Sequence, residues 1–209
     1  VKPVKTWRSP KGTWIIDFGI NMAAVPRIKV NLPTGTTLKM CMAEYSIADT
    51  LNYWTTGPIA TGHIQTDTYT CRGNGVETWT PRFTYHGFRY IELSGIDNLP
   101  GGDWIEAVRV NTDVKVIGDF SCDNAMINRL HSMAVNTFLS NTHGLPTDCP
   151  HRERCGWLGD AHAVAPFESI NCDMENFFVK YMGDVNSSAN FEVKNTLFHE
   201  KYNKYNSMF

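Results

Sequence analysis

The first half of the chain alternates between apolar and polar positions. Arg27–Leu32 and Thr37–Met40 place apolar side chains at every second residue, and turn sequences follow at Leu32–Gly35 and Arg72–Gly75. Because successive side chains of a strand point to opposite faces, this pattern predicts antiparallel strands with one buried face. The alternation blurs over Phe88–Leu93, as expected for strands that are buried on both faces or carry bulges.

The hydrophobic period changes near residues 113–118, from two residues to helical spacing. With Asp123 as the N-cap, the pattern predicts a helix over about Asn124–Leu139 that ends before Gly144. Its apolar stripe comprises Met126, Ile127, Leu130, Met133, Ala134 and Phe138. The sequence therefore predicts a β domain over residues 1–113, followed by a helical domain over residues 114–209.

Two further helices are expected after the first. A second stripe follows Asp173 and comprises Met174, Phe177, Phe178, Tyr181, Met182 and Val185. Between the stripes, Asp160–Asn171 is predicted to be helical, with Pro166 either kinking the helix or delaying its start. Both stripes are expected to be core faces, so a chain that lacks partner helices would leave Met126, Phe177 and Phe178 exposed.

Composition and charge exclude some classes of partner. The 209 residues are 42% hydrophobic with a net charge of -2, which suits a packed core but gives no field suited to nucleic acid or to an anionic membrane. No apolar run approaches the roughly 18 residues of a membrane span. Val1 is neither an initiator methionine nor the start of a signal peptide, so the compartment cannot be inferred. The oligomeric state, including a homo-oligomer, stays open.

The six cysteines are scattered, and we expect free thiols rather than disulfides. A zinc site built from Cys149, His151, Cys155 and His162 is the alternative, but the spacing lacks the tight pairs typical of structural zinc. A lectin-like calcium site at Asp17 and Asp67 is a weaker alternative. The sequence thus predicts neither a metal nor another cofactor.

The segment Asp148–Asp160 concentrates the chemistry of the chain. It holds three carboxylates, two arginines and a tryptophan, together with Pro150 and two glycines. Glycoside cleavage needs a carboxyl group to protonate the leaving oxygen, other carboxylates to bind hydroxyl groups, and an aromatic face for the sugar ring. A solvated loop with surface ion pairs is the alternative. Trp157 beside Gly156, after the stiff Pro150, favours an ordered site.

These residues resemble the signature of the bacterial α-L-rhamnosidases, inverting glycoside hydrolases of family 78. The segment Asp148–Asp160 carries the main motif, and Asp17–Asn21, Thr66–Tyr69 and Pro81–Tyr90 resemble the β-sandwich that precedes the catalytic domain in that family. The resemblance covers about Thr13–Val185. It implies an antiparallel β-sandwich followed by an (α/α)6 six-hairpin barrel, with removal of terminal α-L-rhamnose from rhamnosides or polysaccharides.

The resemblance also implies roles for individual residues. Glu153 corresponds to the general acid. Asp148, Arg152, Trp157 and Asp160 occupy positions that line the rhamnose pocket, where the carboxylates would bind hydroxyl groups and Trp157 would pack on the methyl group and ring face. From the residues alone, Asp148 and Asp160 would favour the protonated form of Glu153, whereas Arg152 would oppose it.

The helical part is too short for a whole barrel, which needs on the order of 200 residues. We therefore expect a fragment, inactive alone, that carries the acid while the general base lies in later sequence. Two alternatives stay open: a related six-hairpin glycosidase with another sugar specificity, and a carbohydrate-binding β-sandwich without catalysis. An apolar pocket wall would favour the 6-deoxy sugar, and sugar binding by the isolated β domain would favour the binding protein.

Overall fold

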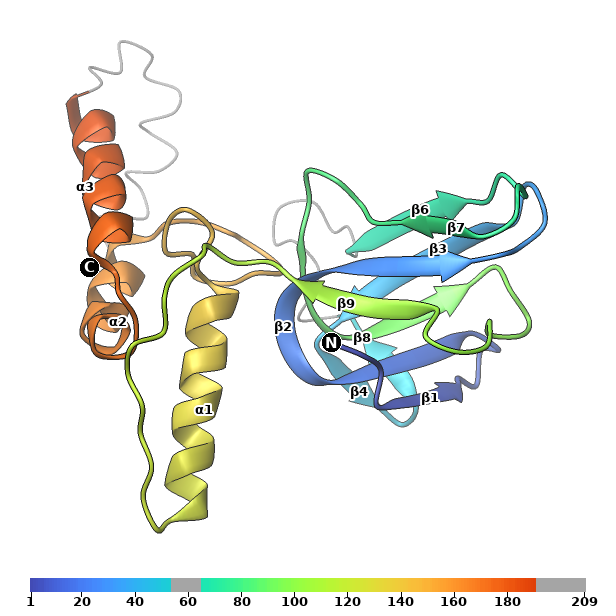
Figure 1. Cartoon of the computed structure of the whole chain (residues 1–209), viewed down its shortest axis with the longest axis horizontal. Helices are drawn as coiled ribbons and strands as arrows, with labels where there is room; N and C mark the ends of the chain where they lie inside the picture. Colours follow the sequence, from blue (N-terminus) through green and yellow to red (C-terminus); the bar gives the residue numbers. More distant parts are fainter. Residues whose placement is uncertain (54–64, 191–209) are drawn as a thin grey trace.

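The computed structural model describes residues 1–53 and 65–190, and within them nine strands precede three helices (Figure 1). The strands are β1 (Lys5–Arg8), β2 (Trp14–Val30), β3 (Thr37–Ala43), β4 (Tyr45–Ile47), β5 (Thr50–Asn52), β6 (Thr66–Thr70), β7 (Glu77–Trp79), β8 (His86–Ser94) and β9 (Ile105–Arg109). The helices are α1 (Ala125–Ser140), α2 (Leu158–Asn171) and α3 (Glu175–Asn190). Strands and helices occupy opposite ends of the molecule.

One long strand organises the β domain. The main sheet runs β1-β2-β8-β3-β6, while β7 and β9 also pair with β2, and β4 and β5 form a small separate sheet. All of these pairings are antiparallel, as predicted. Because β2 contributes to both parts of the sheet, apolar side chains from β2, β3, β8 and β9 meet in one core. Its fully buried members include Phe18, Met22, Ile28, Leu38, Met40, Phe88 and Ile91.

The predicted irregularity is found in β2 opposite β8. The register of this pair shifts between Asp17 and Met22, where Gly19 adopts a positive φ of 76°. Asp17 Oδ1 accepts a hydrogen bond from the Gly19 amide at 2.7 Å. The Arg89 guanidinium donates a hydrogen bond of 2.8 Å to each of the two Asp17 carboxylate oxygens. This bidentate ion pair fixes the start of the bulge.

The proposed calcium pair is not formed. Asp17 is paired with Arg89, whereas Asp67 contacts His86 Nε2 at 3.1 Å through both oxygens. Among the described residues, no group of three or more His, Cys, Asp or Glu side chains is arranged to hold a metal ion. Each carboxylate therefore serves a contact between strands, and the calcium interpretation is wrong.

Helix α1 lies one residue later than predicted at both ends. Its N-cap is Asn124, not Asp123, and the Asn124 side chain accepts the amide of Met126 at 2.9 Å. Asn and Asp side chains are about equally good N-caps, so residue type alone cannot decide between Asp123 and Asn124. The helix ends at Ser140, before the turn at Gly144.

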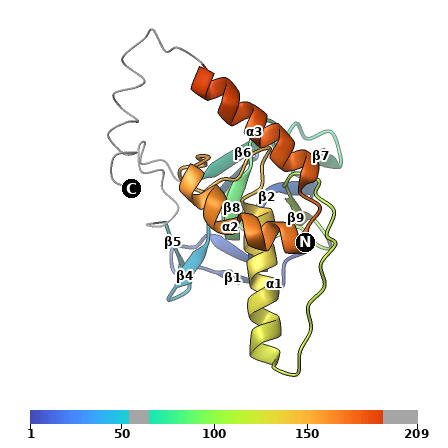
Figure 2. The same ribbon diagram turned by 90° about the vertical axis from the view of Figure 1, so that its left-hand side faces the viewer.

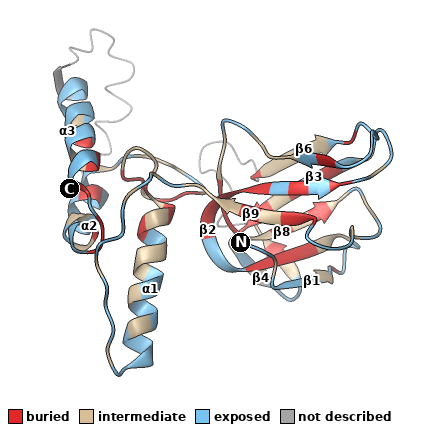
Figure 3. Ribbon diagram, in the orientation of Figure 1, coloured by how far each residue is buried: buried red, intermediate tan, exposed pale blue. Residues whose placement is uncertain are grey.

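The apolar stripe of α1 is largely exposed, as expected of a core face that lacks partner helices. Met126 is 71% exposed, and Leu130 and Met133 are also exposed, whereas Phe138 is buried (Figure 3). The buried apolar contact of α1 with other described elements is made near its carboxyl-terminal end, through Phe138, while His131 in the middle of the helix contacts Asn171 of α2 at 2.7 Å. The stripe therefore has the composition of a core face without the helices that would cover it.

Helix α2 passes the carboxyl-terminal end of α1, and α3 lies beyond that end (Figure 2). Pro166 lies inside α2 and does not delay its start, which is at Leu158. Phe177 is buried against Phe138, Cys172 and Met174, so the expectation that it would be exposed is wrong. The packing among α1, α2 and α3 is therefore enough to bury Phe177 of the α3 stripe.

Two sequence expectations concern the membrane and the cysteines. None of the helices within residues 1–53 and 65–190 has the length and apolar character needed to cross a membrane. The six cysteines are free thiols, three of them buried. Burial with a small side chain suits their role as ordinary packing residues.

We predict that Gly95→Ala destabilises the β domain. Gly95 has a φ of +102°, and a Cβ atom there would lie 1.8 Å from the Thr37 carbonyl oxygen. Strain and steric clash together should lower the free energy of unfolding by about 2 kcal/mol or more. Gly101→Ala is the matched control, because nothing lies within 4 Å of that position. Equal urea midpoints for both variants would contradict the prediction.

Candidate active site

The segment from α1 to α2 folds into an ordered loop between the helices and the β domain. After α1, Gly144 turns the chain with a φ of +77°, and Thr142 forms a β-bridge with Pro146. Further on, a Cβ atom at Gly156 would lie 2.7 Å from Leu145 Cδ1. Close approach at Gly156 holds the loop of residues 148–157, which we call the motif loop, against this turn.

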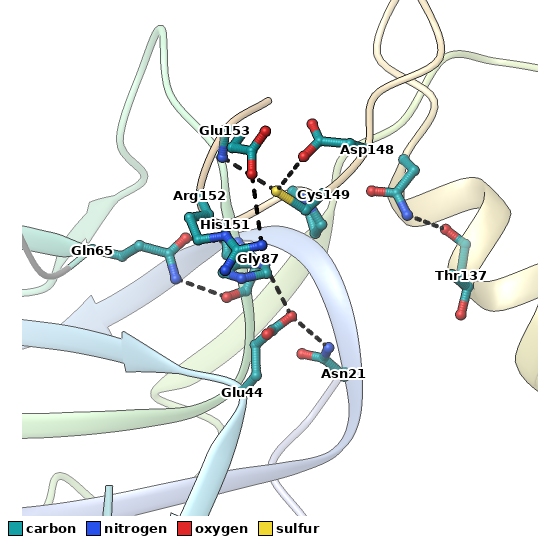
Figure 4. Close-up of polar contacts among 12 residues, drawn as sticks. Asn21, Glu44, Gln65, Gly87, Thr137, Asp148, Cys149, His151, Arg152 and Glu153 are labelled. Carbon is teal, nitrogen blue, oxygen red and sulfur yellow. Dashed lines mark hydrogen bonds and ion pairs between the residues drawn. The ribbon is translucent and has the colours of Figure 1, made fainter. Parts of the chain in front are cut away.

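Asp148 and Cys149 are tied into the interior of the motif loop. Asp148 Oδ1 accepts the amide of Cys155 at 2.9 Å, and the Cys149 thiol lies 3.2 Å from Asp148 Oδ2. The amide of Glu153 contacts Cys149 Sγ at 3.2 Å. The buried sulfur thus joins Asp148 to Glu153, which are five positions apart in sequence (Figure 4).

Glu153 is oriented by its neighbours in the motif loop. Trp157 donates its indole N–H to Glu153 Oε2 at 3.1 Å, and the Arg152 guanidinium lies 3.7 Å from Glu153 Oε1. The Glu153 side chain is 27% exposed, so it can be reached from solvent. Three of the predicted site residues therefore lie in one contact group.

The other two predicted residues, Asp148 and Asp160, line a cavity of about 470 Å³ between α1 and α2. Asp160 lies in the first turn of α2, where a carboxylate interacts favourably with the helix dipole. The cavity walls are mostly apolar and include Ala134, Phe138, Pro146, Ala163, Val164 and Phe167. Neither Glu153 nor Trp157 lines this cavity, so the predicted residues form two adjoining groups.

Glu168 is a cavity residue that the sequence analysis missed. It lies two helical turns after Asp160, so both carboxyl groups face the cavity. Glu168 is only 2% exposed, and its buried Oε2 has no hydrogen-bond partner among the described residues. Burial raises the pKa of Glu168 to about 7, so a large share of this group is protonated at neutral pH. The spacing 160–164–168 in a predicted helix would have indicated it.

The β domain supports the motif loop through stacked rings. Tyr85 stacks on His143 with ring centroids 4.0 Å apart, and the Arg154 guanidinium lies 4.5 Å above the Tyr85 ring. Burial lowers the pKa of His143, although its contact with the Val110 carbonyl opposes this shift. A neutral imidazole avoids repulsion with Arg154. Tyr85 is therefore a support for the loop.

Cys155 in the motif loop is not arranged as a nucleophile. Burial raises the pKa of the Cys155 thiol, and the carboxylates of Asp148 and Glu153 raise it further. Reactive cysteines instead need surroundings that stabilise the thiolate. The chemistry of the motif loop therefore rests on its carboxyl groups.

Comparison with known proteins defines the class. Residues 115–194 match the family model of the bacterial alpha-L-rhamnosidase 6 hairpin glycosidase domain, and residues 7–111 match that of the bacterial alpha-L-rhamnosidase concanavalin-like domain. The fold and the carboxylate-rich loop thus match the six-hairpin glycosidase class. The chain belongs to the bacterial α-L-rhamnosidase family. This confirms the predicted fold, a β-sandwich followed by the first helices of a helical barrel.

Individual relatives agree with this assignment. An alpha-L-rhamnosidase of Formosa agariphila is 39% identical over 88% of this chain and 20% of its own length. The structure of alpha-L-rhamnosidase from Dictyoglumus thermophilum has a TM-score of 0.82 at 40% identity and covers 89% of this chain and 21% of its own. The structure of the Streptomyces avermitilis alpha-L-rhamnosidase complexed with L-rhamnose has a TM-score of 0.82 at 32% identity. The match covers 89% of this chain and 18% of that one. The chain spans about a fifth of the length of these relatives.

The raised pKa of Glu168 predicts a pH-dependent stability. Because the folded state binds the proton more tightly than the ordinary value of 4.5 allows, the contribution of Glu168 to stability is full below about pH 4.5 and is lost as the pH rises through about 7. The difference corresponds to about 3 kcal/mol.

Glu168→Gln should remove this dependence, so the variant gains stability relative to the parent chain between pH 5 and pH 8. Urea unfolding followed by helical circular dichroism measures it. Glu175→Gln, which removes a carboxyl group from the exposed first turn of α3, is the control. A difference between parent and Glu168→Gln that stays constant across this pH range would contradict the prediction.

Proposed function

We propose that this chain is part of an enzyme that removes terminal non-reducing α-L-rhamnose from rhamnosides with inversion. The observation that carries the proposal is the motif loop, in which Glu153 is oriented by Trp157 while Asp148 lines an adjoining cavity. Family membership and a relative described with bound L-rhamnose support the same substrate class. L-Rhamnose-containing glycosides or polysaccharides are the proposed partners.

The proposal assigns the acid role to Glu153. An inverting glycosidase needs one carboxyl group to protonate the leaving oxygen. Since the indole N–H of Trp157 occupies Oε2, the proposal assigns the proton transfer to Oε1, the atom nearer to Arg152. The indole N–H thereby fixes the carboxyl plane, which a general acid requires for good geometry.

The remaining site residues would hold the sugar. Asp148 and Asp160 accept hydrogen bonds from sugar hydroxyl groups, Arg152 donates them, and Trp157 packs against the methyl group and ring face. The apolar walls of the cavity beside Asp148 and Asp160 suit a 6-deoxy sugar, which presents a methyl group where other hexoses present a hydroxyl. Trp157 does not line this cavity, so the choice of rhamnose over another sugar of the six-hairpin class rests on family membership.

We also propose two domains, at residues 1–113 and 114–209, with the second domain incomplete. The separate family matches over 7–111 and 115–194 support this division. The general base then belongs to a part of the enzyme outside this chain, in keeping with relatives about five times longer. That carboxylate would activate water at roughly 6.5 to 9.5 Å from Glu153.

We predict that Glu153→Gln in the complete enzyme loses activity according to the leaving group. Gln keeps the shape but cannot donate the proton, so alcohol-linked rhamnosides should lose about 10²- to 10⁴-fold in kcat/KM. An activated aryl rhamnoside should lose far less. Asp160→Asn is the matched comparison, because a hydroxyl contact does not sense the leaving group and both substrates should weaken alike. Equal losses for both substrates in Glu153→Gln would remove Glu153 from the acid role.

The chain alone should not turn over α-L-rhamnosides, because the water-activating carboxylate and the rest of the barrel lie outside it. Incubation of the purified 209-residue chain with an aryl rhamnoside should release no product above background, whereas the complete enzyme should do so. Turnover by the chain at a rate typical of complete glycosidases, about 1 to 10³ per second, would refute this prediction.

A further inference from the structure

The motif loop lies directly on strand β8 of the sandwich. A Cβ atom built on Gly87 would lie 2.7 Å from Pro150 Cγ and 2.9 Å from His151 Cβ, so no larger residue fits there without moving the loop. The strand is itself held firmly, because Gln65 exchanges two hydrogen bonds of 2.8 Å with the backbone of Gly87. Sandwich and loop therefore share a close, rigid contact.

Glu44, directly after β3, makes the polar part of this contact (Figure 4). Glu44 Oε1 accepts a hydrogen bond from Asn21 Nδ2 at 2.8 Å and lies 3.4 Å from His151 Nδ1. The side chains of Glu44 and His151 are 19% and 12% exposed. Water therefore screens this pair less than it screens a surface ion pair.

Glu44 is in turn held by the bulge of β2. Asn21 lies in that bulge, and its carbonyl oxygen accepts a hydrogen bond from Asn136 of α1 at 2.8 Å. Arg109 of β9 donates to Asn136 Oδ1. Glu44 thus belongs to a polar network that joins β2, β3, β9 and α1 at the motif loop.

A displacement of His151 would reach Glu153. Only Arg152 separates the two residues, and the amide of Glu153 contacts Cys149 Sγ two positions before His151. His151 therefore lies within the tight turn that presents the Glu153 carboxyl group. Because a misplacement of about 1 Å can cost a reaction about 10²-fold, the anchoring of this turn has catalytic consequences.

We infer that Glu44 of the β-sandwich is a positioning residue for Glu153 and acts through His151. The inference rests on the proposed function, in which Glu153 is the general acid. The sandwich then supplies part of the catalytic apparatus. The Glu44 carboxylate contacts the turn at His151, and Gly87 packs against the same turn at Pro150. The sugar itself is bound by other residues.

The test compares variants of the complete enzyme on two rhamnosides, one with an alcohol leaving group and one with an activated aryl leaving group. Glu44→Ala removes both the acceptor and the charge, so kcat on the alcohol-linked substrate should fall roughly 10- to 100-fold, and much less on the aryl substrate. Glu44→Gln keeps an acceptor for Asn21 and a partner for His151, so it should restore most of the loss. KM should change little in either variant.

Glu92→Gln is the matched control. Glu92 is also a half-buried carboxylate of the sandwich, and its partners are the hydroxyl groups of Thr13 and Tyr53. Within the described part of the chain, no hydrogen bond or ion pair joins Glu92 to the motif loop. It should leave the ratio of the two kcat values unchanged. Gly87→Ala is a second probe, because its methyl group pushes on Pro150 without removing any polar group. It should reproduce the leaving-group-dependent loss.

Each other outcome would overturn the inference. Equal losses of kcat on both substrates in Glu44→Ala and Gly87→Ala would mean that the contact only maintains the fold. A rise in KM at constant kcat would make Glu44 a sugar-binding residue. Failure of the proposed function is distinguishable, since it would appear as the absence of rhamnosidase activity in the parent enzyme.

Discussion

The bulge in β2 is the constraint on which both halves of the described structure depend. Strand β2 is 17 residues long, and among the described elements it pairs with β1, β8, β9 and β7. Such a strand must change direction to serve both parts of the sheet, and a bulge provides the bend. The ion pair of Asp17 with Arg89 and the positive φ of Gly19 set its geometry. The bend that closes the core thus also brings Asn21 to the helices.

This arrangement explains how a loop with no regular structure of its own can hold a catalytic geometry. Functional groups are held most precisely when rigid elements support them. The motif loop rests on β8 at Gly87, stacks through Arg154 on Tyr85 and is anchored at its far end by α2. Its own sulfur-centred contacts at Cys149 then fix the carboxyl groups relative to each other. Most of this support comes from residues far away in sequence.

That distance also explains which features could be predicted from the sequence. Strands, helices and the motif loop follow from local periodicity and from residue types within a few positions, so their existence and type were predictable. The N-cap at Asn124 instead of Asp123 shows the limit of local information, since both residues can cap. The burial of Phe177, which was expected to be exposed like Met126, depends on how the three helices pack against one another, and no local pattern specifies that packing.

The site shows the same division between local and long-range information. Glu153, Trp157 and Arg152 are neighbours in sequence, and the structure brings them into contact. By contrast, Glu44 lies 107 positions before His151 in the sequence and becomes its neighbour only through the pairing of β3 with β8. Its carboxylate looks like any polar residue at the end of an alternating strand. Long-range register, not composition, gives it a role.

The proposed inverting mechanism would give this architecture a physical rationale. The acid and the base must act from opposite faces of the sugar, with room for a water molecule between them, so one short loop cannot carry both. A loop anchored on a preformed sandwich can hold the acid independently of the element that supplies the base. The apolar face of α1 around Leu130 and Met133 then offers the surface on which later helices could pack while the acid stays fixed. Under this proposal, the sandwich would hold the Glu153 carboxyl group in position before further helices pack on α1.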